Sequence, residues 1–362
     1  MRTIRITGTG SALPGRIVTN KELEQLVETS DEWIRERTGI AERHVSVGET
    51  VVTLASEAAR KALEQAGKRA EEIDLILVAT CSPEQYLPCC ACQVQAAIGA
   101  VNALAFDVNA ACSGFLFALN TADAYLRTGL AENALVIGSE VLSKLVDWTD
   151  RGSCILFGDG AGAVVVERCR TESRAVEYSN ALPETEKGMQ ETAEEKRIPA
   201  AGILGRALHS DGTGGGVLQC GARELTTPYA RTSAAKTDQK QQTDDREHYI
   251  QMDGQEVYRF ATRRVPQCIE EALSDAGLAV PDIDMFVLHQ ANARIIDAVA
   301  KRLHADRDKF PTNLERVGNM SSASIPVLLD ELNRQRKLHR GDRIVLAGFG
   351  AGLTIGACVM TW

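Results

Sequence analysis

The chain has 362 residues, of which 44% are hydrophobic, so its length predicts two domains or one large domain built from two halves. Its net charge of -9 argues against binding along an extended nucleic acid, because contacts to phosphates depend on clustered Lys and Arg side chains. Only a small basic patch is compatible with this charge.

The N-terminal sequence MRTIRITGTGSALPG is interrupted by charged residues and Gly before any apolar stretch reaches the length of a signal peptide or membrane span. Ten cysteines without a secretory signal fit free thiols in a reducing compartment better than a disulfide framework. We therefore expect a cytoplasmic protein that does not contact a membrane and in which few thiols are reactive.

A helix followed by a strand is predicted over residues 59–80, and the same pattern recurs over residues 267–290. Each copy contains an amphipathic helix, a Gly that ends it, and an Ile-Asp pair before a short apolar strand. Two later strands, 132–140 and 341–350, also correspond. Two related halves in which helices alternate with buried strands predict a layered α/β fold.

The loops that follow these four strands are candidates for a ligand site, because ligands of such sheets bind beyond the carboxyl ends of the strands. The loops begin with CSPEQYLP, SEVLS, HQANARI and GFGAGLT. If the two halves pack symmetrically, we expect these loops to converge on one site.

Cys112 lies where an apolar strand runs through Ala-Ala-Cys-Ser-Gly into an apolar helix, residues 106–119. A thiol at the start of a helix faces the positive end of the helix dipole, which is expected to lower its pKa and favour the nucleophilic thiolate. A buried structural cysteine is an equally good interpretation of this position taken alone.

Four other cysteines are clustered at positions 81, 89, 90 and 92. The cluster lacks the paired C-x-x-C ligands of a typical zinc site, so we predict no metal and interpret these thiols as core residues.

The segments 171–200 and 222–248 are polar and lack a clear apolar period. Both are predicted to be surface insertions on either side of a strand and turn, GILGRALHSDG. A regulatory or partner-binding role is the alternative.

His289 ends the strand DMFVLHQ, on the copy of the repeat that matches the loop after ILVAT, so it is expected to face the same cleft as Cys112. A nucleophilic Cys needs a base or a cation beside it, and His is the usual one. Alone, a His at a strand end is more often structural. The other five histidines, at positions 44, 209, 248, 304 and 339, lie in polar or turn-like surroundings.

Asn319 precedes a helix that is expected to begin near Ile325-Pro326. An Asn in a turn is ordinarily a helix cap or a left-handed residue, although its amide can also donate to an oxyanion. The segment 348–356, GFGAGLTIG, is rich in Gly but is not GxGxxG, so a tight turn beside the cleft is favoured over a phosphate site. A backbone N-H of such a turn can serve an oxyanion hole.

Taken together, these motifs resemble the β-ketoacyl-acyl-carrier-protein synthase III family of the thiolase fold, which initiates bacterial fatty-acid synthesis. The resemblance extends over almost the whole chain. Its motifs are TSDEWIRERTGI (29–40), ACQVQAAIG (91–99), AACSGF (110–115), DWTDRGSCILFGDGAGA (147–163), LHSDG (208–212), MDGQEV (252–257), HQANARI (289–295), GNMSSASIP (318–326) and GFGAGLT (348–354).

The resemblance implies a layered α-β-α-β-α fold of two pseudo-symmetric halves. The N-terminal half, with the nucleophilic Cys, is expected over residues 1–170, and the C-terminal half, with His and Asn, over residues 249–362. The segment 171–248 then holds the insertions with their strand and turn.

The resemblance also implies a reaction, a decarboxylative Claisen condensation in which the family's Cys, His and Asn are Cys112, His289 and Asn319. Cys112 takes the acyl group from acyl-CoA, which is a substrate, so no cofactor is expected. Backbone N-H groups of Cys112 and Ala351 hold the oxyanion. Malonyl-acyl carrier protein then loses CO₂, and the resulting carbanion attacks acyl-Cys112.

Substrate contacts carry over from the family in the same way. The residues implied for CoA are Trp33, Arg37, Arg151, Gly254 and Asn292. Trp33 and Arg151 are suited to adenine by stacking and cation-π contact. Arg294 resembles the family's docking residue for the acidic acyl carrier protein.

Leu87 stands where some straight-chain-specific members carry Phe, at a position that closes the partner subunit's acyl pocket in the family homodimer. The smaller Leu leads to the hypothesis of a pocket that accepts longer or branched primers. The insertions make the chain longer than is typical of the family.

Two alternatives remain. One is a related acyltransferase or priming condensing enzyme of secondary metabolism, which would also use an acyl-Cys. The other is a Cys-His hydrolase, which is disfavoured because no papain-like signature surrounds Cys112.

Overall fold

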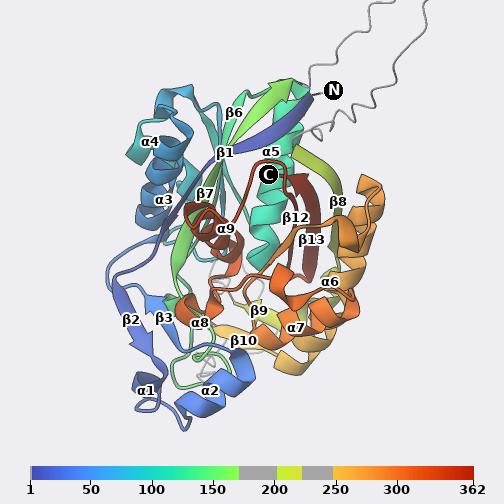
Figure 1. Ribbon diagram of the computed structural model, residues 1–362. Coiled ribbons are helices and arrows are strands. Elements are labelled where there is room, and N and C mark those ends of the chain that lie inside the picture. Colours follow the sequence, from blue (N-terminus) through green and yellow to red (C-terminus); the bar gives the residue numbers. More distant parts are fainter. Residues whose placement is uncertain (1, 171–201, 222–247) are drawn as a thin grey trace, which may run out of the picture.

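The computed structural model describes residues 2–170, 202–221 and 248–362 (Figure 1). The predicted insertions 171–200 and 222–248 lie outside these residues, apart from His248. Across the described parts of the chain, we find no helix that combines the length and apolarity needed to cross a membrane.

The N-terminal half is built on a five-stranded sheet with the order β1-β7-β6-β4-β5. Strand β4 is parallel to both β5 and β6, whereas β7 is antiparallel to β6 and β1. The strands are β1 (Arg2–Ala12), β4 (Leu75–Ala79), β5 (Leu104–Val108), β6 (Asn133–Glu140) and β7 (Gly160–Arg170).

The C-terminal half repeats this arrangement in a four-stranded sheet with the order β11-β12-β13-β8. Strands β11 and β12 are parallel, and β13 is antiparallel to β12 and β8, as β7 is to β6 and β1. The predicted middle segment 171–248 therefore contributes one strand to the C-terminal sheet. The strands are β8 (Gly202–Ser210), β11 (Met285–Leu288), β12 (Arg343–Gly350) and β13 (Thr354–Thr361).

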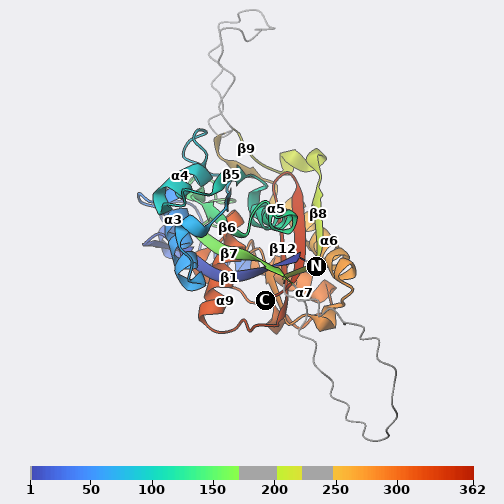
Figure 2. The same cartoon turned by 90° about the horizontal axis from the view of Figure 1, so that it is seen from above.

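Two apolar helices, α5 (Gly114–Thr128) and α9 (Ser324–Arg334), lie between the sheets. Their buried side chains, among them Phe115 and Leu328, share one core with strand residues such as Val136 and Leu346. Figure 2 shows α5 between the strands of the two sheets, in agreement with its contacts to β6 and β12. These helices form the central layer of the fold.

Each sheet is covered on its outer face by a second pair of helices. α3 (Val51–Ala66) and α4 (Cys90–Ile98) pack on the N-terminal sheet, and α6 (Gly254–Ala276) and α7 (Ala293–Arg302) pack on the C-terminal sheet. The five layers confirm the predicted α-β-α-β-α fold of two related halves (Figure 1).

The remaining elements lie beyond the carboxyl ends of the central strands, in the lower part of Figure 1. Several of them contribute side chains to a separate apolar cluster that includes Ile34 and Phe157. The elements are β2 (Arg16–Thr19), α1 (Asn20–Leu23), α2 (Asp31–Thr38), β3 (Glu42–Val45), β9 (Leu218–Cys220), β10 (Ile250–Met252) and α8 (Leu314–Val317).

The Gly stops predicted in the internal repeat are confirmed. Gly67 ends α3 with a φ of 65°, and Gly277 ends α6 with a φ of 66°, both in the left-handed region that Gly adopts without steric cost. At the other end, Thr50 and Asp253 accept hydrogen bonds from backbone N-H groups of the first turns of α3 and α6.

Gly162 of β7 is where α9 approaches the sheet most tightly, because a Cβ atom built there would lie 2.5 Å from the backbone nitrogen of Val327. We predict that Gly162→Ala lowers the free energy of unfolding by about 1 to 3 kcal/mol through overpacking. Urea denaturation would measure the loss. Gly15→Ala is the matched control, since its added Cβ meets nothing within 4 Å. Equal stability of the two variants would contradict the prediction.

Candidate active site

Cys112, His289 and Asn319 line one cavity of about 290 Å³. They come from three separate segments, which follow β5, follow β11 and precede α9. Strand ends that are distant in the sequence meet here because the two halves pack face to face around α5 and α9. The structure therefore brings together the three residues that the sequence singled out.

Cys112 occupies the middle of a 3₁₀ turn, η2 (Ala111–Ser113), that leads directly into α5. Ala111 has a φ of 45°, which is strained for a residue other than Gly. The turn is fixed by Ser113, whose hydroxyl oxygen lies 2.8 Å from the carbonyl oxygen of Ala110 and 2.7 Å from the hydroxyl of Thr354. Backbone geometry thus presents the Cys112 side chain to the cavity.

The expected low pKa of Cys112 is wrong. Burial raises the pKa of this thiol to about 12, and the nearby Glu140 carboxylate adds to the increase, although a hydrogen bond with Ser321 opposes it. The loss of solvation is the largest contribution to this increase. Cys112 is therefore a neutral thiol in the resting site at pH 7.

His289 directly follows β11, and its backbone N-H donates to the backbone carbonyl of Ala347 at 2.8 Å. Its ring meets Phe349 edge-on, with 5.7 Å between the ring centroids. Burial lowers the pKa of His289 to about 3. The imidazole is consequently neutral at pH 7, and its buried Nδ1 has no hydrogen-bond partner among the described residues.

Asn319 is held through its backbone by the segment that precedes β7. Its N-H donates to the carbonyl of Leu156, and its carbonyl accepts from the N-H of Gly158, both at 2.9 Å. The side-chain oxygen accepts from the N-H of Ser321 at 2.9 Å. Because the amide oxygen is occupied in this way, the amide nitrogen is the group left to donate to a ligand.

The Gly-rich turn after β12 packs against Cys112. A Cβ atom at Gly350 would lie 2.6 Å from the backbone nitrogen of Cys112, so only Gly permits this approach. Ala351 lines a second cavity together with Cys112. The oxyanion-hole role of these two N-H groups stays a prediction.

This second cavity has a volume of about 430 Å³ and shares the lining residues Cys112, Phe157 and Leu218 with the first. Sequence reasoning missed its apolar wall. Leu142 belongs to one of the loops singled out after the strands, but no local pattern marks the others as pocket residues. The wall comprises Leu142, Leu145, Phe157, Leu218 and Ile250.

Arg37, Gly254 and Asn292, three of the residues implied for CoA, line the first cavity. Trp33 lies beside it, with the guanidinium carbons of Arg37 and Arg151 at 5.6 and 4.9 Å from its ring centroid. Asn292 also caps α7 by accepting from the N-H of Arg294 at 2.8 Å. It donates as well to the carbonyl of Arg37 at 3.1 Å.

The last two predicted residues lie outside both cavities. Arg294 lies over the ring of Tyr258, itself a wall residue of the first cavity, at 5.8 Å from the centroid. Leu87 is 85% exposed in the loop between β4 and α4 and does not reach the pocket of its own chain.

Glu140, at the end of β6, is a fully buried carboxylate that sequence reasoning also missed. It accepts from the hydroxyls of Ser82 at 2.5 Å and Ser322 at 2.8 Å, and from the N-H of Cys81 at 3.1 Å. Burial raises its pKa. Through these bonds Glu140 ties the loops after β4 and β6 to the start of α9, beneath Cys112.

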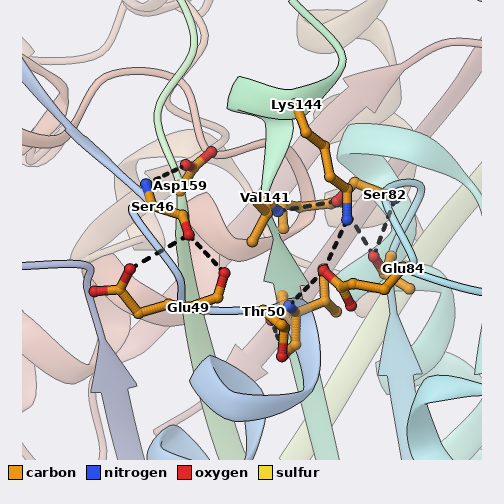
Figure 3. A network of polar contacts seen from close by, with 12 residues as sticks. Ser46, Glu49, Thr50, Ser82, Glu84, Val141, Lys144 and Asp159 are labelled. Atoms are coloured by element: carbon orange, nitrogen blue, oxygen red, sulfur yellow. Dashed lines mark hydrogen bonds and ion pairs between the residues drawn. The ribbon is translucent and has the colours of Figure 1, made fainter.

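A neighbouring polar network fixes the same loops from outside (Figure 3). Lys144 forms an ion pair with Glu84 at 2.7 Å, and the N-H of Val141 donates to Ser82 at 3.0 Å. Asp159 accepts from the N-H of Ser46 at 2.7 Å. These bonds join the loops after β3, β4 and β6 to one another, so the positions of the loops around the site are fixed by several independent contacts.

Two profiles of one family match the chain. The profile described as 3-Oxoacyl-[acyl-carrier-protein (ACP)] synthase III matches residues 106–181, and the one described as its C terminal matches residues 273–362. The Beta-ketoacyl-[acyl-carrier-protein] synthase III of Clostridium acetobutylicum is 44% identical over 362 residues, which is 100% of this chain and 99% of that protein.

Solved structures agree. The 3-oxoacyl-[acyl-carrier-protein] synthase III from Aquifex aeolicus matches with a TM-score of 0.83 and 38% identity, covering 99% of this chain and 100% of that chain. The priming β-ketosynthase from the R1128 polyketide biosynthetic pathway matches with a TM-score of 0.83 and 33% identity, covering 99% of this chain and 96% of that chain.

The neutral state of His289 predicts how stability depends on pH. Its pKa is lowered from 6.5 to about 3 on folding, so below pH 6.5 the unfolded chain binds a proton that the folded protein does not. The free energy of unfolding should therefore fall with decreasing pH, by up to about 1.4 kcal/mol per pH unit. Urea denaturation at about pH 7 and pH 5 measures how much the free energy of unfolding decreases between these two pH values. The decrease should be smaller for His289→Gln than for the wild type. An equal decrease in the free energy of unfolding for both proteins would argue against a buried neutral imidazole.

Proposed function

Because the chain belongs to the β-ketoacyl-[acyl-carrier-protein] synthase III family, we propose that it carries out the family reaction through an acyl-Cys112 intermediate. The protein is an acyltransferase that condenses an acyl primer with malonyl-acyl carrier protein and so initiates fatty-acid synthesis. The observation that best supports Cys112 as the acyl carrier is that, of the three residues lining both cavities, Cys112, Phe157 and Leu218, it alone has a nucleophilic side chain.

In the first half-reaction, the sulfur of Cys112 attacks the thioester of acyl-CoA. The resting thiol is neutral, so it must lose its proton as the substrate binds. His289 is neutral and lines the same cavity, which makes it the base for this proton and then the donor that returns it to the departing CoA sulfur. Backbone N-H groups of Cys112 and Ala351 hold the oxyanion.

In the second half-reaction, malonyl-acyl carrier protein enters the first cavity and loses CO₂. His289 and Asn319 donate hydrogen bonds to the thioester oxygen, where negative charge develops in the enolate. The low pKa of His289 favours the neutral ring, which keeps one N-H for donation and places no fixed charge in the site. The enolate carbon then attacks the carbonyl carbon of acyl-Cys112, the bond between that carbon and the sulfur breaks, and the departing thiolate takes up one proton from the solvent.

The first cavity is the proposed CoA and pantetheine tunnel. Trp33 and Arg151 take the adenine ring by stacking, and Arg37 meets a phosphate. Gly254 and Asn292 complete the wall. Arg294, beside the tunnel residue Tyr258, docks the acidic carrier protein by charge attraction. Acyl-CoA is a substrate in this scheme, and no cofactor takes part.

The second cavity is the proposed primer pocket, and a homodimer completes it. Leu87, Tyr86 and Leu104 are apolar and more than half exposed, and Leu104 lies on β5, the edge strand of its sheet. An apolar surface beside an open sheet edge is suited to pairing with a second copy. In that dimer the partner subunit's Leu87 closes the pocket, and its modest size admits longer or branched primers.

Separating the two half-reactions tests these roles. After incubation with acetyl-CoA, peptide mass spectrometry should find the acyl group on Cys112 in the wild type and in the control Cys92→Ser, but no thioester in Cys112→Ser. Asn319→Ala should still become acylated, yet lose on the order of 10²-fold or more in condensation. The mechanism is wrong if Cys112 stays unmodified or if Cys112→Ser turns over normally.

Leu87→Phe should narrow the primer pocket. We expect kcat/KM for isobutyryl-CoA and hexanoyl-CoA to fall by roughly tenfold or more relative to acetyl-CoA, the scale of discrimination that one methylene group produces in an apolar pocket. Leu130→Phe is the control, because Leu130 is exposed and lines neither cavity. A strict preference for acetyl-CoA in the wild type, unchanged by Leu87→Phe, would refute the assignment.

A further inference from the structure

Arg43 is a fully buried cation that the proposed mechanism does not use. It lies on β3 with 0% of its surface exposed. Within the described chain, the guanidinium donates only to neutral groups, and its Nε has no hydrogen-bond partner. Burial lowers its pKa to about 10, so it remains charged at pH 7. Burying a charge without a carboxylate partner costs free energy, which hydrogen bonds to neutral groups must offset. The positions of those neutral groups therefore indicate what Arg43 holds in place.

The groups that Arg43 holds lie on two sides. Its Nη2 donates to the carbonyl of Ile155 at 2.8 Å, and its Nη1 donates to the carbonyl of Val18 at 3.2 Å and to the side-chain oxygen of Asn20 at 2.8 Å. The planar guanidinium thereby spans the space between the β2-α1 corner and the segment that begins at Ile155. The ammonium group of a Lys is a single point charge and could not donate to both sides in this way.

The segment after Ile155 is the one that fixes Asn319. Leu156 and Gly158 exchange backbone hydrogen bonds with Asn319, both at 2.9 Å, and Phe157 lies opposite it in a parallel bridge. The carbonyl of His44, the next residue after Arg43, accepts from the N-H of Asp159 at 2.9 Å. The segment is therefore pinned from β3 at both of its ends.

Packing as well as hydrogen bonding joins Arg43 to this segment. Cβ atoms built at Gly158 and Gly318 would lie 3.3 and 3.2 Å from the Cβ of Arg43, so the backbones on either side of Asn319 rest on the stem of the Arg side chain. Gly318 has a φ of 68°, a left-handed conformation that sets the direction of the chain just before Asn319.

On the other side, Arg43 is connected through Asn20 to the proposed CoA site. Asn20 is also fully buried and donates to the carboxylate of Asp31 and the carbonyl of Ile40, both at 2.8 Å. Asp31 is the first residue of α2, the helix that carries Trp33 and Arg37. Arg43 thus lies between the helix proposed to bind CoA and the segment that fixes Asn319.

We propose that Arg43 is a positioning residue for Asn319: by holding the carbonyl of Ile155 it sets the backbone against which Asn319 presents its amide to the malonyl thioester. This inference rests on the role proposed above for Asn319 in decarboxylation and condensation. It assigns Arg43 to the second half-reaction, because Cys112 is fixed independently by Ser113 and Thr354.

The experiment measures the two half-reactions separately in Arg43→Met. Acetylation of Cys112 by acetyl-CoA, followed by mass spectrometry, should proceed as in the wild type. Condensation of the acetylated enzyme with malonyl-acyl carrier protein should slow on the order of 10²-fold, the effect expected of a displacement near 1 Å. In an Asn319→Ala background, Arg43→Met should cause no further loss of condensation, since both changes remove one function.

Two further variants complete the design. Arg340→Met is the matched control, because Arg340 also donates to a backbone carbonyl, that of Ile6 at 2.9 Å, but Ile6 lies on β1 and not in the segment that fixes Asn319. Both half-reactions of this variant should be unchanged. Arg43→Lys keeps a cation and most of the side-chain stem, so it should fold, become acetylated normally and condense at an intermediate rate. Circular dichroism and thermal denaturation verify folding.

The proposal is overturned if Arg43→Met slows both half-reactions equally, if its effect adds to that of Asn319→Ala, or if condensation is unchanged. It is also overturned if neither Arg43 variant folds, because Arg43 would then be required for the fold itself. If Asn319→Ala condenses normally while Cys112 is acetylated, the role proposed for Asn319 fails instead, and the two failures are thereby distinguished.

Discussion

The packing of α5 and α9 between the two sheets is the constraint on which the site depends. Each helix starts from a 3₁₀ turn whose first residue is left-handed, with a φ of 45° at Ala111 and 46° at Ser321. These conformations are strained for side chains other than Gly, so the surrounding core must hold them. The two turns contact each other, and this contact brings Cys112 from one half beside Asn319 from the other.

Burial then determines the charge state of the two proposed catalytic groups, Cys112 and His289. Removing Cys112 and His289 from water raises the pKa of the thiol and lowers that of the imidazole, so both are neutral before substrate arrives. A neutral pair in an apolar site avoids the desolvation cost of a permanent ion pair. Proton transfer is therefore tied to substrate binding, when N-H donors can stabilise the negative charge that develops on the thioester oxygen.

Much of the fold could be predicted from the sequence, because its signals are local. The apolar period of α3 and α6, their Gly stops and the strands after them were visible as a repeat, and the repeat supplied the reason to expect His289 opposite Cys112. The family motifs supplied the reaction and the substrate contacts. The residues of the reactive turn were also identifiable, because a strand that runs through Cys into an apolar helix is a local pattern.

Other features depended on contacts between distant segments. The helix end suggested a low pKa for Cys112, but desolvation of this half-buried thiol raises its pKa instead. The apolar pocket wall, the buried Glu140 and the hydrogen bonds of Arg43 also join residues that no local pattern connects. The sequence by itself determined the layered fold and which residues are proposed to react, since periodicity and motifs are properties of short segments. Only the tertiary structure decided how deeply those groups are buried and what holds them, because desolvation and long-range hydrogen bonds arise when the halves pack together.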